Sequence, residues 1–136
     1  MGPKKKSEKL ARLVSVQRHM ERMAESDLSN TARQRDEVSA SMHTVMDAIG
    51  SLDPVHRLFA QSYAERFDRL ANMEKQLAGI QQAQEAKVVR ERVKGDRLEE
   101  NRQEARLDED REAEDNAIYD MVDMRYATPA SSKLQE

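Results

Sequence analysis

Between Pro3 and Pro129 the chain contains a single proline, Pro54, and this placement is the strongest constraint on its fold. Proline ends or kinks an α-helix, so the long stretches on either side of Pro54 are free to be helical throughout. Gly50 suits the position after a helix, Asp53 suits the N-cap of the next helix, and Pro54 suits its first turn. The sequence therefore predicts helices at 8–50 and 54–127, joined by a turn at 51–53 as an antiparallel hairpin.

The composition excludes both a large globular core and a disordered chain. Charged residues make up 36% of the 136 residues and aromatic residues 4%, with a mean hydropathy of -0.93. Such a chain is either disordered or built from long helices that bury a narrow stripe. The four glycines and three prolines are too few for a typical disordered chain, and the other residues are mostly good helix formers. The absence of cysteine excludes disulfides and thiolate chemistry.

Apolar residues recur along both predicted helices at a spacing between 3.5 and 3.6, which is typical of a coiled-coil seam. In residues 8–50 polar side chains interrupt this seam at Gln17, Thr31 and Arg35. The apolar positions of the two helices are Leu10, Leu13, Val14, Met20, Ala24, Leu28, Ala32, Val38, Met42, Val45, Met46 and Ile49, then Val55, Leu58, Phe59, Tyr63, Phe67, Leu70, Met73, Leu77, Ile80 and Val88. After Val93 the stripe thins to Leu98, Ala105 and Leu107, and it recovers at Ile118, Tyr119, Met121, Val122 and Met124.

The unequal lengths of the two helices set where pairing should stop. A turn centred near residue 52 places residue i beside about 104 − i, so the first helix runs out opposite residue 95 or 96. The apolar stripe thins near Gly95 as well. The predicted fold class is all-α: an antiparallel two-helix coiled-coil hairpin whose longer second helix extends beyond the first. Residues 1–7, a basic tail, and residues 128–136 are expected to be disordered.

No catalytic, cofactor-binding or metal-binding residues are predicted. The histidines His19, His43 and His56 have no i, i+4 pair, so surface histidines are favoured over a metal site. The acidic run from Asp108 to Asp115 lacks the offsets of a calcium loop and is better explained as a solvated helix face. We expect a protein that is not an enzyme.

Phe59, Tyr63 and Phe67 follow one another at intervals of four residues, just after the turn. Packing within the seam is the favoured explanation. The alternative is a partly exposed docking patch, to which Met42 and Val45 from the end of the first helix would contribute, because exposed apolar patches mark protein contacts.

Charge and hydropathy limit the partners and the location. Residues 101–136 carry 10 acidic and 5 basic side chains, which argues against duplex DNA and suits a basic protein surface. No apolar run approaches the roughly 20 residues of a membrane span, and the N-terminus lacks the apolar core of a secretory signal. We expect a cytoplasmic protein without direct membrane insertion.

Two segments resemble the FliJ/YscO type of protein from bacterial flagellar and type III export systems. These are the basic amphipathic stretch Lys9–Arg18 and the pattern Glu104-Ala105-Arg106-Leu107-Asp108-Glu109. The resemblance covers nearly the whole chain loosely. It implies a stalk, similar to the gamma subunit of rotary ATPases, that binds the hexameric export ATPase, the cytoplasmic part of the export gate and substrate chaperones. It places Leu107, Asp108 and Glu109 on the ATPase-facing segment and Met42, Val45, Phe59, Tyr63 and Phe67 at the gate.

The resemblance also implies a cytoplasmic location at the periphery of the inner membrane, reached through these partners. The chain departs from the family in its length beyond Glu109 and in an acidic stretch where the family has a basic tip. A self-associating coiled-coil scaffold or holding chaperone is the alternative function. A weaker one is binding to a membrane surface or nucleic acid through Lys4–Arg12, which predicts strongly salt-dependent binding.

Overall fold

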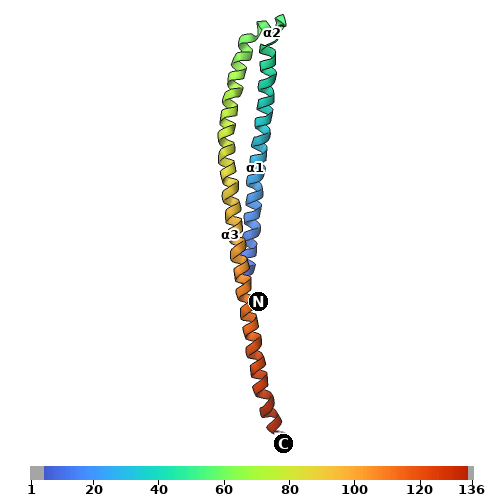
Figure 1. Ribbon diagram of the computed structural model, residues 1–136, viewed down its shortest axis with the longest axis vertical. Helices are drawn as coiled ribbons and strands as arrows, with labels where there is room; N and C mark the ends of the chain where they lie inside the picture. The colour runs from blue at the N-terminus through green and yellow to red at the C-terminus, as the bar shows by residue number, and fades with distance from the viewer. Residues whose placement is uncertain (1–4, 135–136) are drawn as a thin grey trace. The chain divides into compact units, whose positions relative to one another are not determined.

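The computed structural model describes residues 5–134, and the side chains of residues 5–127. It contains three helices, α1 (Lys6–Ile49), α2 (Pro54–Leu58) and α3 (Ala60–Leu134) (Figure 1). The chain divides into two units. The hairpin unit is Gln17–Gly95; the terminal unit combines Met1–Val16 with Asp96–Glu136.

Within the hairpin unit, α1 and α3 lie side by side in opposite directions and are joined through α2 (Figure 1). The predicted all-α hairpin of long helices is confirmed. The turn follows the predicted chemistry: Asp53 caps α2, its carboxylate accepting a hydrogen bond from the Val55 amide at 3.0 Å, and Pro54 opens the helix. Gly50 follows the last residue of α1, but its backbone is not left-handed.

The prediction of one uninterrupted second helix from residue 54 is wrong at Phe59. The backbone there leaves the helical region, with φ −106° and ψ 12°, and separates α2 from α3. The Phe59 amide bonds to the His56 carbonyl at 3.2 Å, which tightens the last turn of α2. The reversal of the chain therefore occupies residues 50–59, a longer connection than the predicted turn at 51–53.

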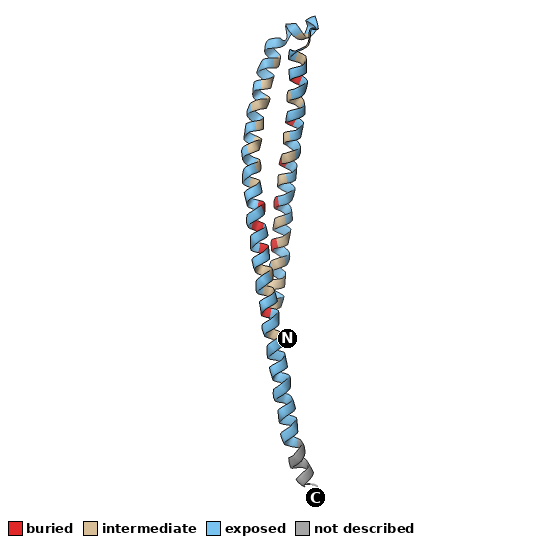
Figure 2. Ribbon diagram, in the orientation of Figure 1, coloured by how far each residue is buried: buried red, intermediate tan, exposed pale blue. Residues whose placement is uncertain are grey.

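A seven-residue repeat organises the seam of the hairpin unit. The buried residues of α1 are spaced seven apart, and in Figure 2 they mark one side of the helix: Gln17, Ala24, Thr31, Val38 and Val45. A strict seven-residue repeat is the geometry in which two helices supercoil around each other. Met20, predicted as a seam residue, is 44% exposed, because the repeat places Gln17 and Ala24 inward instead.

The longer connection also shifts the register. A turn centred near residue 52 would place Gln17 beside residue 87 and Arg35 beside residue 69. Instead, Gln17 bonds to Glu91 and Arg35 bonds to Glu74. Each α1 residue therefore meets a later part of α3 than predicted, and the predicted limit of pairing near residue 95 falls too early.

The terminal unit shows how far pairing continues. Ser7, near the start of α1, contacts Glu109 of α3, and Ala105, four residues before Glu109, is only 6% exposed. Residues 110–127 are all exposed (Figure 2).

Both predicted tails differ from the structure. Helix α1 begins at Lys6, inside the predicted disordered segment 1–7, while residues 1–4 lie outside the described part of the chain. Helix α3 runs to Leu134, seven residues past its predicted end at 127, and residues 135–136 are not described. Propagating a helix is much easier than nucleating one, so a long helix continues past residues that would not start one.

Candidate protein-binding surfaces

Two of the three polar side chains that interrupt the seam, Gln17 and Arg35, are paired across it, whereas the Thr31 hydroxyl donates to the Asp27 carbonyl of its own helix at 3.2 Å. The Arg35 guanidinium donates to the Glu74 carboxylate at 2.9 Å from Nε and to the Gln81 side-chain oxygen at 2.9 Å from Nη1. The Gln17 side-chain amide donates to the backbone carbonyl of Glu91 at 3.1 Å and to its carboxylate at 2.5 Å. A polar residue at a seam position specifies register, because any other register leaves it buried without its partner.

These contacts set the charge states of the seam. Hydrogen bonding to Glu74 raises the pKa of Arg35 above its usual value. The hydrogen bond from Gln17 lowers the pKa of Glu91, with smaller contributions from Lys94 and Lys87, against burial, which raises it. Both groups therefore stay ionised at neutral pH. Their contacts hold the two helices in one register.

The Glu109 side chain of α3 caps the N-terminal turn of α1. Its carboxylate accepts hydrogen bonds from the Ser7 amide at 3.0 Å and from the Ser7 hydroxyl at 2.5 Å. The first amides of a helix lack partners within the helix, and a carboxylate there is favoured by the helix dipole. Lys5 precedes the helix and its carbonyl accepts hydrogen bonds from the Glu8 and Lys9 amides, so Ser7 lies inside the first turn and is not the N-cap. The cap comes from α3.

The pH dependence of this cap follows from Glu109. The Ser7 side chain, then the Ser7 amide, and more weakly Lys5, lower its pKa below the usual 4.5. The contribution of the cap to stability is therefore complete above the ordinary pKa and is lost as the pH falls through the lowered one.

We expect Glu109→Gln to speed hydrogen exchange of the amides at residues 7–11 at neutral pH, measured by NMR. Glu112→Gln, at an exposed position, should leave that exchange unchanged.

The three residues expected to face an ATPase therefore differ in availability. Leu107 is 58% exposed and Asp108 is also exposed. Glu109 is half-buried and engaged by Ser7. Leu107 and Asp108 remain available as contact residues, whereas a change at Glu109 would disturb α1 as well as any partner.

Most of the residues expected at an export gate have side chains that are buried or half-buried. Val45 is buried at 4% exposure, while Met42, Tyr63 and Phe67 are half-buried in the seam, as the favoured explanation had it. The Tyr63 hydroxyl also lies 3.1 Å from Nδ1 of His56. Of the five, only Phe59 is exposed, at 50%.

A different apolar surface lies at the turn of the hairpin unit. Six large apolar side chains between residues 46 and 59 are each at least 45% exposed; we call them the tip patch: Met46, Ile49, Leu52, Val55, Leu58 and Phe59. Leu52 and Leu58 are the most open, at 81% and 82%. The density of apolar residues around a turn was visible in the sequence. Their exposure was not visible in the sequence: none of the five residues of α2 is buried.

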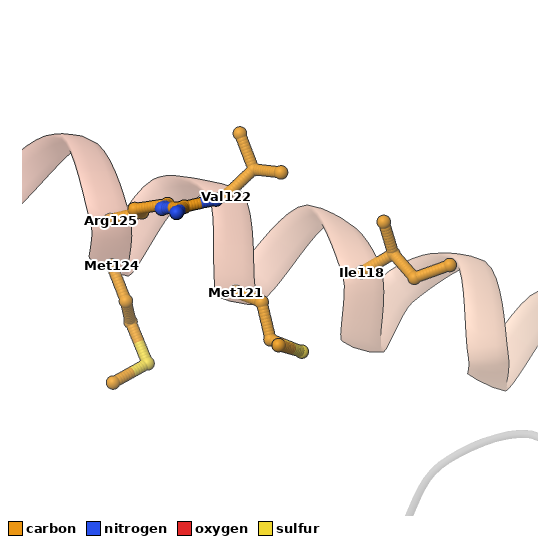
Figure 3. A pocket seen from close by; sticks show the side chains of 5 residues that line it. All are labelled: Ile118, Met121, Val122, Met124 and Arg125. Carbon is orange, nitrogen blue, oxygen red and sulfur yellow. The ribbon is translucent and has the colours of Figure 1, made fainter.

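A second apolar surface lies near the end of α3 in the terminal unit. Ile118, Met121, Val122 and Met124, with Arg125, line a shallow groove; we call these four apolar residues the C-terminal stripe. Ile118 and Val122 point to one side of the helix and Met121 and Met124 to another, with Arg125 between (Figure 3). Sequence periodicity identified these residues as apolar but assigned them no role.

No metal site or membrane span accompanies these surfaces in the described residues. No three histidine, aspartate or glutamate side chains there are placed to hold a metal ion. None of the described helices carries an apolar stretch long enough to cross a membrane. Comparison with known proteins found no matching family model, curated protein or solved structure.

Proposed function

We propose that this chain is a non-enzymatic stalk in a bacterial flagellar or type III export apparatus. In this proposal it is a two-helix coiled coil whose α3 extends beyond the start of α1. It binds the hexameric export ATPase, contacts the export gate and substrate chaperones, and is cytoplasmic, reaching the inner membrane through these partners. Besides the sequence resemblance, the observation that supports it most is the polar, register-fixed seam. A stalk gripped by a ring has to transmit force without sliding of its helices, and cross-seam pairs such as Arg35–Glu74 oppose sliding.

Within this proposal, each partner is given one exposed surface of the chain. Leu107 and Asp108 face the ATPase, and Glu109 holds the start of α1 in place behind them. The tip patch replaces the buried Val45 and the half-buried seam residues as the surface for the export gate. Large apolar side chains that stay exposed as a contiguous patch mark protein contact sites.

Binding to a purified hexameric export ATPase tests the proposal. We expect Asp108→Lys to weaken that binding at least about tenfold, measured by biolayer interferometry, because it reverses the charge of an exposed contact residue without touching the Glu109 cap. Asp68→Lys, a matched reversal on an exposed position of the hairpin unit, should bind like the parent chain. Unchanged binding of Asp108→Lys would remove this segment from the interface, and no binding by the parent chain would reject the stalk.

A self-associating scaffold or holding chaperone is the second candidate, favoured by the tip patch. Two copies meeting through these apolar side chains would bury them without any export partner. Sedimentation velocity separates the two functions. A monomer at micromolar concentration supports the stalk, whereas a stable dimer or tetramer dissociated by Leu52→Gln/Leu58→Gln supports the scaffold.

A further inference from the structure

The apolar side of α3 changes face at the end of the pairing with α1. Up to Glu109, the inward positions of α3 follow a seven-residue repeat that includes Val88, Glu91, Ala105 and Glu109. Continued by the same repeat, that face carries Glu112, Asn116 and Asp123 together with the exposed tyrosines Tyr119 and Tyr126, and none of the aliphatic residues found further along the helix. At 100° per residue, the C-terminal stripe lies on the opposite side of the helix. A helix packed where α1 packs would therefore not reach it.

The stripe is apolar but set in a strongly acidic background. Between residues 108 and 123 the chain carries eight acidic side chains and one basic one, Arg111. By the same helical geometry Asp110 and Glu114 lie on the stripe's own side of the helix, in the two turns before Ile118, and Asp115 lies along its edge beside Val122. Ile118 is 57% exposed, Met121 70% and Val122 43%, so the described residues leave this apolar surface open.

From these observations we propose that the C-terminal stripe is the docking surface for a basic amphipathic helix of another protein. The apolar residues of such a helix would fill the groove between the Ile118/Val122 row and the Met121/Met124 row. Lysine and arginine residues beside its apolar face would meet the carboxylates of Asp110, Glu114 and Asp115. This is the helix-in-groove mode of recognition, with charge selecting the partner and apolar burial holding it.

Charge decides against a second copy as the occupant. Two copies paired along this segment would bring two stretches of seven net negative charges together, and like charges at close range oppose association. A basic helix would instead be attracted by the same carboxylates. The proposal does not depend on the export assignment, because the stripe lies on its own segment beyond Leu107 and Asp108.

The test uses the full chain and two 18-residue helical probe peptides, one of leucine and lysine and one of leucine and glutamate. We expect the lysine peptide to bind at least about tenfold more tightly than the glutamate peptide by fluorescence anisotropy at 150 mM salt. Ile118→Gln/Val122→Gln, which removes the apolar stripe without changing charge, should weaken binding of the lysine peptide by about tenfold or more. Leu52→Gln/Leu58→Gln, a matched change at the equally open tip patch, should bind within about twofold of the parent.

Three outcomes would overturn the proposal. The first is equal binding of both peptides, and the second is unchanged binding of the lysine peptide by Ile118→Gln/Val122→Gln. The third is self-association of the parent chain that this same variant abolishes in sedimentation velocity, since that would make a second copy the occupant. Helix content by circular dichroism confirms that each variant is folded; because these side chains are exposed, we expect it to be unchanged. Binding of the export ATPase is measured separately with Asp108→Lys, so failure of one proposal leaves the other standing.

Discussion

Replacing Val45 by Asp is expected to lower the free energy of unfolding by about 3–4 kcal/mol. The substitution gives up the burial of a valine side chain, worth about 1.5–2 kcal/mol. It also places a carboxylate without a partner at a position only 4% exposed, which costs a further 1–3 kcal/mol or so. The effect is large relative to the core of the hairpin unit, because its buried apolar side chains include only Ala24, Val38, Val45 and Val88.

Urea unfolding followed by circular dichroism at 222 nm measures this effect, and the midpoint of thermal unfolding should fall by more than about 10 °C. Met46→Asp is the matched control. Its position is the next residue of the same helix and is 53% exposed, so the same charge should cost less than about 1 kcal/mol. Equal losses for the two variants would mean that Val45 is not in the seam. The comparison also separates Val45 as a packing residue from Val45 as a contact for a partner.

Replacing Ala105 by Asp is expected to release the start of α1 from α3. Ala105 is 6% exposed within the terminal unit, and an unpaired carboxylate there costs about 2 kcal/mol. A local loss of that size raises hydrogen exchange of the amides at residues 8–16 roughly 30-fold. Exchange measured by mass spectrometry should localise the change to this segment.

Ala113→Asp is the control, because Ala113 is exposed on the same helix and the substitution is chemically identical. It should leave exchange at residues 8–16 within about twofold of the parent. If Ala105→Asp behaved in the same way, pairing would end near residue 95, as the simple turn geometry predicted. The pair of variants therefore measures the register of the two helices at their far end.

The elements of the fold could be predicted from the sequence because their causes are local. The scarcity of glycine and proline predicted two long helices, and the capping pair Asp53 and Pro54 predicted where α2 begins, but not the break at Phe59 after which the second long helix starts. The polar interruptions Gln17 and Thr31 were found on the seam face, and both are buried. The candidate surfaces were predicted less well: Leu107 and Asp108 are exposed as expected, but Val45 is inside and Glu109 caps α1.

The sequence by itself thus determined that this chain is helical, where it reverses and that its apolar surface is a narrow stripe. Propensity, capping and periodicity act over a few residues and need no knowledge of the partner helix. Only the tertiary structure decided the register. The break at Phe59 lengthens the reversal, and every later pairing, from Gln17 with Glu91 to Ser7 with Glu109, moves with it. Packing of α1 against α3 also decides that Val45 is buried while Met46 is exposed, and register decides that α1 contacts α3 as far as Glu109, because each of these depends on contacts between residues distant in the chain.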